Sequence, residues 1–84
     1  MTRWFVYIGR CKDGSLYIGM TTDITERIKR HNSGNGAKWI TQHGSITVEF
    51  TEEFETYIQA HRRELQLKKW TRIKKERLIK DLKP

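Results

Sequence analysis

Residues 5–19 read FVYIGRC-KDG-SLYIG, two runs of β-branched and aromatic residues on either side of a turn signal. An Asp-Gly pair between two such runs is a strong local signal for a β-hairpin. The turn could contain two residues, Asp13 and Gly14, or three, with Lys12 added and Gly14 in the left-handed conformation. We favour the three-residue loop.

The choice of loop decides which residues of the two strands face each other, because a shift of one residue moves every side chain to the other face. The three-residue loop sets three pairs opposite each other: Cys11 with Ser15, Gly9 with Tyr17, and Tyr7 with Gly19. Tyr7 and Tyr17 then lie on one face, diagonal to each other, with a glycine opposite each phenol. Two phenols beside two missing side chains leave room for a ligand to approach.

The length of 84 residues predicts one small domain spanning residues 1–84. Hydrophobic residues make up 36% and charged residues 32%, which indicates a compact core and a heavily charged surface. The only cysteine, Cys11, excludes an internal disulfide and suits a reducing compartment; we interpret it as a small strand residue rather than a catalytic thiol. Because no segment resembles a signal peptide or is long enough to span a bilayer, we expect a cytoplasmic protein.

The net charge of +7 is concentrated at one end of the sequence. Residues 61–84 hold ten Lys/Arg and three Asp/Glu, whereas the first sixty residues hold seven of each. A one-sided basic field of this kind attracts polyanions, although a solvated helical surface is the ordinary alternative. The candidate nucleic-acid-binding residues are Lys38, Lys68, Lys69, Arg72, Lys74 and Lys75.

The rest of the chain predicts three helices and one more strand. Capping motifs predict one helix from residue 24 to about Asn32 and a second from residue 57 to about Trp70. Thr71 is expected to cap a third helix that reaches about Lys80. Alternating apolar residues over 46–51 predict the strand. The expected fold class is therefore α+β, a three-stranded antiparallel sheet flanked by helices in the order β-β-α-β-α-α.

On the first predicted helix, Arg27 and His31 share a face with Ile24 and Ile28, because these four residues recur at steps of three and four. Arg27 and His31 therefore border the apolar stripe instead of lying opposite it. On position alone, a packing role is the favoured interpretation of each.

The second predicted helix places a carboxylate among apolar residues. Its apolar stripe contains five residues: Tyr57, Ile58, Ala60, Leu65 and Leu67. His61 and Glu64 fall within the same arc, and a buried carboxylate is costly unless a cation, a metal ion or hydrogen-bond donors lie nearby. An ion pair between Glu64 and Arg27 would explain the inward charge without any chemistry. Periodicity alone favours neither this ion pair nor a functional role.

This order of residues, from hairpin tyrosines to a helical Arg and His and then an inward Glu, resembles the GIY-YIG nuclease superfamily. The sequence is most similar to the small stand-alone bacterial members. Five dispersed stretches carry the resemblance, which covers nearly the whole chain in the expected order: Phe5-Val6-Tyr7, Tyr17-Ile18-Gly19, Thr21-Thr22-Asp23 through Arg27 to His31-Asn32, Gly36-Ala37-Lys38, and Arg63-Glu64 through Lys68-Lys69.

The resemblance implies hydrolysis of nucleic-acid phosphodiester bonds, with DNA the favoured substrate, and a divalent cation, Mg²⁺ or Mn²⁺. By this resemblance, Glu64 would be the only direct protein ligand of the metal, which fits hard-cation chemistry. Tyr7 would activate or position the attacking water, and Tyr17 would line the site. Arg27 would stabilise charge that develops on the phosphoryl oxygens. His31 would assist proton transfer or hold Tyr7.

The sequence departs from the family pattern at three points. Phe5-Val6 replaces Gly-Ile before the first tyrosine, Met20 stands where some repair nucleases carry Lys, and no Asn follows Glu64. From a length of 84 residues we also expect no appended DNA-recognition domain. Because Lys and Arg contacts to phosphate give affinity without sequence information, we expect weak sequence preference, or targeting by another protein or by nucleic-acid shape.

Two alternatives compete with a nuclease that acts in DNA repair, recombination or turnover. The first is a non-catalytic nucleic-acid-binding module that retains the fold. The second is a zinc site formed by His31, His43 and His61, which is disfavoured because their spacing matches no zinc motif and no paired cysteines are present.

Overall fold

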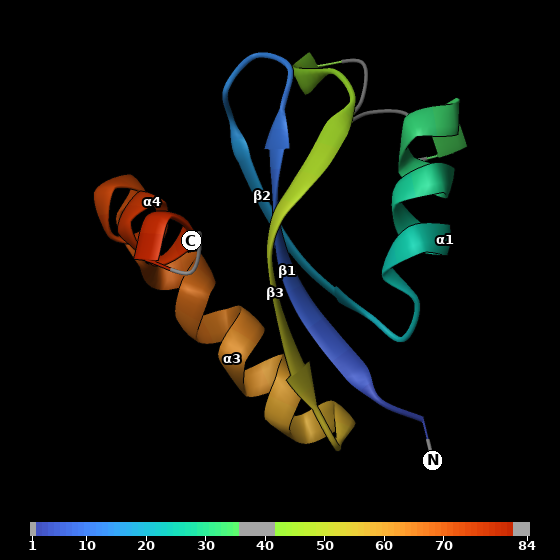
Figure 1. Cartoon of the computed structure of the whole chain (residues 1–84), viewed down its shortest axis with the longest axis vertical. Coiled ribbons are helices and arrows are strands. Elements are labelled where there is room, and N and C mark those ends of the chain that lie inside the picture. Colours follow the sequence, from blue (N-terminus) through green and yellow to red (C-terminus); the bar gives the residue numbers. More distant parts are fainter. Residues whose placement is uncertain (1, 36–41, 82–84) are drawn as a thin grey trace.

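The computed structural model describes residues 2–35 and 42–81. It contains a three-stranded antiparallel sheet with helices on both sides (Figure 1). The elements in chain order are β1 (Trp4–Cys11), β2 (Leu16–Thr21), α1 (Ile24–Arg30), the π-helical turn η1 (His31–Asn35), β3 (Ile46–Phe54), α3 (Tyr57–Lys69) and α4 (Arg72–Asp81). The predicted α+β class and the order β-β-α-β-α-α are confirmed.

The sheet has the order β2-β1-β3, so β1 is the central strand. Tyr7 pairs with Gly19 and Gly9 with Tyr17, which confirms the register of the three-residue loop. In that loop Gly14 has a φ of +89°, a conformation that glycine adopts without steric cost. The hairpin is therefore the one that the Asp-Gly signal and the favoured loop length predict.

Helix α1 begins as predicted, because the Asp23 carboxylate accepts a hydrogen bond from the backbone N–H of Glu26 at 3.0 Å. Its α-helical part ends at Arg30, where the sequence predicts a helix to about Asn32. The following π-helical turn is tied to the start of β3 by Asn32. The Asn32 side chain accepts from the backbone N–H of Ile46 at 2.8 Å and donates to its carbonyl at 3.1 Å.

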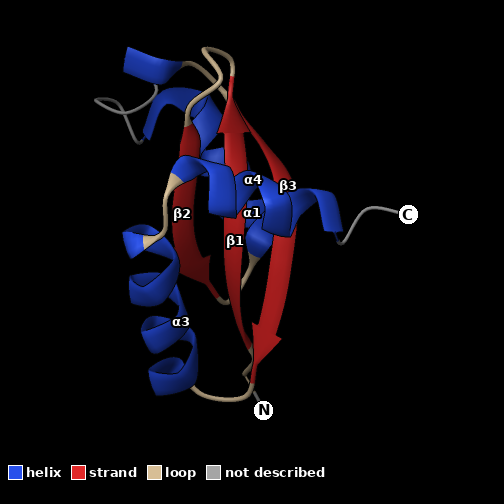
Figure 2. Ribbon diagram, turned by 90° about the vertical axis from the view of Figure 1, so that its left-hand side faces the viewer, coloured by secondary structure: helices blue, strands red, loops and turns tan. Residues whose placement is uncertain are grey.

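Successive side chains of a β-strand point to opposite faces of the sheet, and β1 has four consecutive buried residues, as expected of a strand covered on both faces. Helices α3 and α4 cover the face opposite α1 (Figures 1 and 2). The main hydrophobic core lies between the sheet and these two C-terminal helices. It consists of Val6, Ile8, Ile18, Phe50, Ala60, Leu67 and Ile79. Tyr7 lies between Val6 and Ile8 in the chain and therefore points to the other face, toward α1.

The apolar stripe predicted for α3 is partly wrong. Ala60 and Leu67 are fully buried, but Tyr57, Ile58 and Leu65 are 51%, 60% and 45% exposed. Ala60 and Leu67 are seven residues apart and set the face that contacts the sheet, whereas Ile58 lies roughly 160° around the helix from Ala60. The helix is therefore rotated relative to the prediction.

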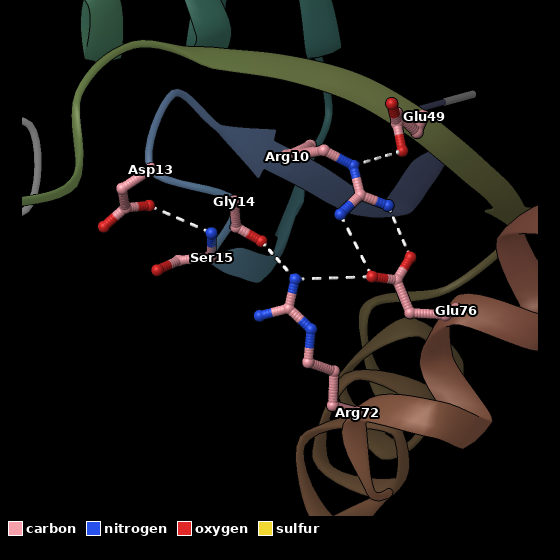
Figure 3. A network of polar contacts seen from close by, with 7 residues as sticks. All are labelled: Arg10, Asp13, Gly14, Ser15, Glu49, Arg72 and Glu76. Atoms are coloured by element: carbon pink, nitrogen blue, oxygen red, sulfur yellow. Dashed lines mark hydrogen bonds and ion pairs between the residues drawn. The ribbon is translucent and has the colours of Figure 1, made fainter.

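Helix α4 begins after Thr71, whose hydroxyl accepts a hydrogen bond from the backbone N–H of Lys74 at 3.2 Å, as predicted. A polar network holds α4 against the hairpin and β3 (Figure 3). Arg10 donates to Glu49 at 2.9 Å and forms a two-bonded pair with Glu76. Arg72 donates to the Gly14 carbonyl and lies 3.4 Å from Glu76. None of the described helices is long and apolar enough to span a membrane.

Candidate active site

Four of the five predicted catalytic residues form one cluster on the α1 side of the sheet. The rings of Tyr7 and Tyr17 have centroids 6.0 Å apart, and the Tyr17 and His31 centroids are 5.0 Å apart. Arg27 lies close enough to both Tyr7 and His31 to shift their pKa values. The cluster therefore combines two strands, α1 and the turn that follows it.

Glycines beside the tyrosines leave space, but protein atoms fill that space rather than a ligand. A Cβ at Gly19 would lie 2.6 Å from the Tyr7 hydroxyl oxygen and 3.0 Å from the Tyr17 ring. A Cβ at Gly9 would overlap Ile46. The expectation that both glycines leave room for a ligand is therefore wrong. Gly19 instead allows the Tyr7 phenol to pack closely against β2.

The Tyr7 hydroxyl is buried and makes no hydrogen bond of good geometry among the described residues, although Tyr17 and Arg27 lie close enough to it for longer polar contacts, and the whole residue has no exposed surface. Burial raises the pKa of Tyr7 well above its usual value, and Tyr17 adds to this effect, while the positive charge of Arg27 opposes it. Tyr7 is therefore a neutral phenol at physiological pH. Its hydroxyl can donate to, or accept from, a group that enters the cluster.

His31 is held in its neutral form. Burial lowers the pKa of His31, and the nearby Arg27 guanidinium lowers it further. Its Nδ1 atom is buried and has no hydrogen-bond partner among the described residues. A neutral imidazole with a free nitrogen can accept a proton. The cluster therefore contains one weak acid, one proton acceptor and one fixed positive charge.

Glu64 has a mostly buried side chain, only 13% exposed, as the helical pattern predicts. Its carboxylate lies 3.5 Å from the Lys68 ammonium and 3.5 Å from Nδ1 of His61. These are its ion-pair neighbours within residues 2–35 and 42–81, so the described structure contains no ion pair between Glu64 and Arg27. That explanation of the inward charge is wrong.

Glu64 comes from α3, which covers the face of the sheet opposite α1, the helix that carries Arg27 (Figure 1). Lys68, the partner of Glu64, lines a cavity of about 290 Å³ together with Tyr17. Tyr7, Tyr17, Arg27 and His31 are thus brought together, and Lys68, the ion-pair partner of Glu64, lines a cavity that Tyr17 also lines.

The predicted nucleic-acid-binding residues fall into three groups. Lys68 and Lys75 line the cavity beside Tyr17, and Lys69 is exposed on α3. Arg72 donates a hydrogen bond to the Gly14 carbonyl in the hairpin loop, and the Lys74 ammonium lies 4.2 Å from the centre of the Trp70 ring. The sixth predicted residue, Lys38, lies outside the described residues.

The three histidines of the zinc alternative have separate surroundings. His31 packs on Tyr17, and His61 stacks on Tyr57. His43 lies 2.8 Å from the Asp13 carboxylate, in the hairpin loop. No group of three or more His, Cys, Asp or Glu side chains that could hold a metal ion occurs in the part of the chain that the structure describes.

Two residues that support the cluster are not apparent as such in the sequence. Gly19 accommodates the Tyr7 phenol, and Asn32 fixes the turn that carries His31 to the backbone of Ile46. Gly19 is visible in the pairing with Tyr7, but the direction of the phenol is not. The Asn32 contact joins residues fourteen positions apart, across a segment with no periodic pattern.

Residues 3–77 match the family model described as the GIY-YIG catalytic domain. The chain belongs to the GIY-YIG family. This family is a nuclease superfamily whose members act on nucleic acids and generally use a divalent metal ion.

Similar proteins place the chain among the small members of the GIY-YIG family. It is 43% identical to the UPF0213 protein of Staphylococcus aureus strain Mu3, over 96% of this chain and 99% of the relative. The UPF0213 protein MW0443 of strain MW2 gives the same values. The solution NMR structure of the UPF0213 protein BH0048 from Bacillus halodurans is 42% identical, covers 95% of this chain and 85% of its own, and has a TM-score of 0.62.

Proposed function

We propose that this GIY-YIG protein is a metal-dependent endonuclease that hydrolyses phosphodiester bonds, with DNA as its substrate. The observation that carries the proposal is the buried hydroxyl of Tyr7, which makes no hydrogen bond of good geometry among the described residues and lies beside Tyr17 and Arg27. A buried polar group without a partner is costly, and such groups persist mainly where function requires them. We therefore propose that the Tyr7 hydroxyl forms its hydrogen bond with a reacting group during catalysis.

The metal ion would be held by Glu64. A lone carboxylate suits Mg²⁺ or Mn²⁺, because Mg²⁺ commonly keeps several waters and completes its shell with substrate phosphate oxygens. Lys68 balances the Glu64 charge when no metal ion is bound, and its long, half-exposed side chain can move aside. A divalent ion at this position would polarise the phosphoryl group and stabilise the charge that develops on it.

The cluster of Tyr7, Tyr17, Arg27 and His31 accepts the proton of the attacking water and orients that water and the phosphoryl group. His31 is neutral and accepts the proton of the attacking water. The raised pKa of Tyr7 argues against a phenolate, so its hydroxyl holds and orients that water as a neutral phenol. Arg27 stabilises negative charge on the phosphoryl oxygens, and Tyr17 forms the wall between the cluster and the edge of β2. We place this activity in DNA repair, recombination or turnover in the cytoplasm.

The test is cleavage by the wild type and by Glu64→Gln, with Mg²⁺, Mn²⁺ or EDTA, on single-stranded, duplex and branched DNA and on RNA. We expect metal-dependent cleavage that falls by a factor of at least ~100 in the variant, the scale expected when a main electrostatic contributor is removed. Glu53→Gln is the matched control, because it makes the same charge change at an exposed carboxylate on β3. Circular dichroism checks that each variant is folded.

Two outcomes would contradict parts of the proposal. Undiminished cleavage by Glu64→Gln would rule out the metal ligand. A wild type that binds DNA yet cuts no substrate with either metal would indicate a non-catalytic nucleic-acid-binding module.

A further inference from the structure

The outer edge of β2 presents backbone donors to its surroundings. In the sheet order β2-β1-β3, only one side of β2 pairs with a described strand. The N–H of Cys11 donates to the Ser15 carbonyl at 2.9 Å, which sets the alternation along the hairpin. Leu16 and Ile18 therefore occupy the pairs that do not bond to β1, and their N–H and C=O groups point outward.

The cavity beside Tyr17 opens on this edge. Its walls are three consecutive residues of β2 and two lysines, and it has a volume of about 290 Å³. The lining residues are Leu16, Tyr17, Ile18, Lys68 and Lys75. Among the described residues no carboxylate lines the cavity, although Glu64 lies 3.5 Å from the Lys68 ammonium. Two ammonium groups from different helices, together with the outward N–H groups of β2, give it the chemistry of an anion site.

Lys68 and Lys75 differ from the neighbouring cations in their contacts. Arg72 is bound to the Gly14 carbonyl and to Glu76, and Lys74 lies on the Trp70 ring. Lys75 has no ion-pair partner within the described residues, and Lys68 is shared with Glu64. Of the five candidate nucleic-acid-binding residues that the structure describes, two therefore line the same cavity.

We infer that this cavity binds a backbone phosphate of the nucleic-acid strand, next to the phosphate that is cut. The inference rests on the proposed function and names the path of the substrate. Tyr17 belongs both to this cavity and to the cluster with Tyr7 and His31, so a strand in the cavity continues toward the reacting groups. Its phosphate bridges Lys68 and Lys75 and accepts from the outward N–H groups of β2.

The first test compares Lys75→Met with Lys80→Met, using fluorescence anisotropy of a labelled DNA in EDTA over a range of KCl concentrations. Both variants remove one charge from α4, but Lys80 is exposed and does not line the cavity. Loss of one phosphate contact lowers the slope of log K against log salt by roughly 0.7–0.9. We expect this loss for Lys75→Met and an unchanged slope for Lys80→Met.

The second test neutralises one phosphate at a time with methylphosphonate linkages along the same DNA. In the wild type, one linkage weakens binding more than its neighbours do. Because interacting groups give non-additive effects, that linkage should cause no further loss in Lys75→Met. Equal losses at every linkage in both proteins would overturn the inference.

The binding tests contain no metal ion, so their result is independent of cleavage. Equal slopes for the two variants, in a protein that cuts DNA, would overturn the phosphate site and leave the nuclease proposal standing. A selective loss for Lys75→Met in a protein that cuts nothing would support the site and contradict the nuclease proposal. Thermal unfolding of each variant confirms that the fold is retained.

Discussion

The hydroxyl of Tyr7 is kept in the interior at a cost to stability. A buried hydroxyl without a hydrogen-bond partner destabilises a protein by about 1–3 kcal/mol. Burial and the neighbouring Tyr17 also hold the phenol in its neutral form. At this residue, stability and activity are therefore expected to respond in opposite directions.

We predict that Tyr7→Phe leaves the free energy of unfolding unchanged or raises it by about 1 kcal/mol, because the substitution removes only the unsatisfied hydroxyl. DNA cleavage by the same variant should fall by at least ~10-fold, in the range of general acid–base and positioning contributions. Urea denaturation and a cleavage assay measure the two effects.

Tyr57→Phe is the control, because Tyr57 is half exposed and lies outside the cluster, and it should change neither quantity. A loss of more than 1 kcal/mol in Tyr7→Phe would show that the hydroxyl is hydrogen-bonded in the protein.

Tyr7 and Gly19 also show which features of the site can be predicted from sequence and which cannot. The pairing of Tyr7 with Gly19 could be predicted, because a loop type fixes a register. That the Tyr7 phenol fills the space over Gly19 could not be predicted, because this depends on the χ angles of Tyr7 and on the packing of α1 above it.

Among the elements, α4 depends on side chains far away in the sequence. Arg10 and Glu76 are 66 positions apart and form a two-bonded pair that joins α4 to β1 (Figure 3). Both side chains are about one-third exposed, which reduces what the pair contributes. Capping at Thr71 can be predicted from sequence, but such a pairing has no local signal.

We predict that Glu76→Gln destabilises the protein by about 1 kcal/mol, because it removes a charge-assisted pair but leaves Arg10 in contact with Glu49. Backbone amides of α4 should exchange faster than those of α3, since the opening is local. Hydrogen exchange measured by NMR checks this expectation.

Glu26→Gln is the matched control for that prediction. Its carboxylate is exposed and lies 3.8 Å from Arg30 within one helix, so its loss should cost no more than about 0.5 kcal/mol. Equal effects of the two substitutions would contradict a specific role of Glu76 in holding α4.

The orientation of α3 shows how helical periodicity can mislead. Ile58 and Leu65 suggest an apolar face, yet the face that meets the sheet contains the small residue Ala60 and the charged residue Glu64. Amphipathic patterns locate a buried face only when apolar residues are confined to it. The inward position of Glu64 was predicted in spite of this, because it lies between the true and the predicted face.

Acid should destabilise the folded protein, because it protonates two carboxylates that stabilise the hairpin end of the molecule, Asp13 and Glu76. The Ser15 N–H and His43 hold the pKa of Asp13 at about 2, below its usual 3.8, and the Arg10 guanidinium lowers the pKa of Glu76. Because both pKa values are lower in the folded state, the unfolded chain binds more protons as the pH falls below about 4.5. The stabilisation is therefore complete above that pH and is lost toward pH 2.

We predict that the thermal midpoint of the wild type declines between pH 4.5 and pH 2, and more steeply than that of an Asp13→Asn, Glu76→Gln double variant. The variant starts lower but has lost the two groups whose protonation is coupled to unfolding. Calorimetry at fixed ionic strength measures both curves, and parallel curves would contradict the assignment. Fixed ionic strength matters because the protein carries a net charge of +7 before any carboxylate is protonated.

At the scale of the whole chain, the reacting groups and the charge come from different parts of the sequence. Tyr7, Tyr17, Arg27 and His31 precede residue 32, whereas the excess positive charge follows residue 60. The sequence predicts each part separately. Their meeting along the edge of β2 depends on how α3 crosses the sheet, which no local pattern encodes.

At the outer edge of β2, the backbone N–H groups that face outward are not the ones that hold the strand in the sheet. Since the N–H groups of Leu16 and Ile18 point outward, neither contributes to the ladder with β1. Proline, which lacks this hydrogen, is tolerated at such edge positions more readily than inside a sheet. Amino-acid changes at Leu16 or Ile18 that alter only the side chain keep the main-chain hydrogen in place, so these two positions can diverge in sequence without losing the N–H groups that the proposed phosphate site uses.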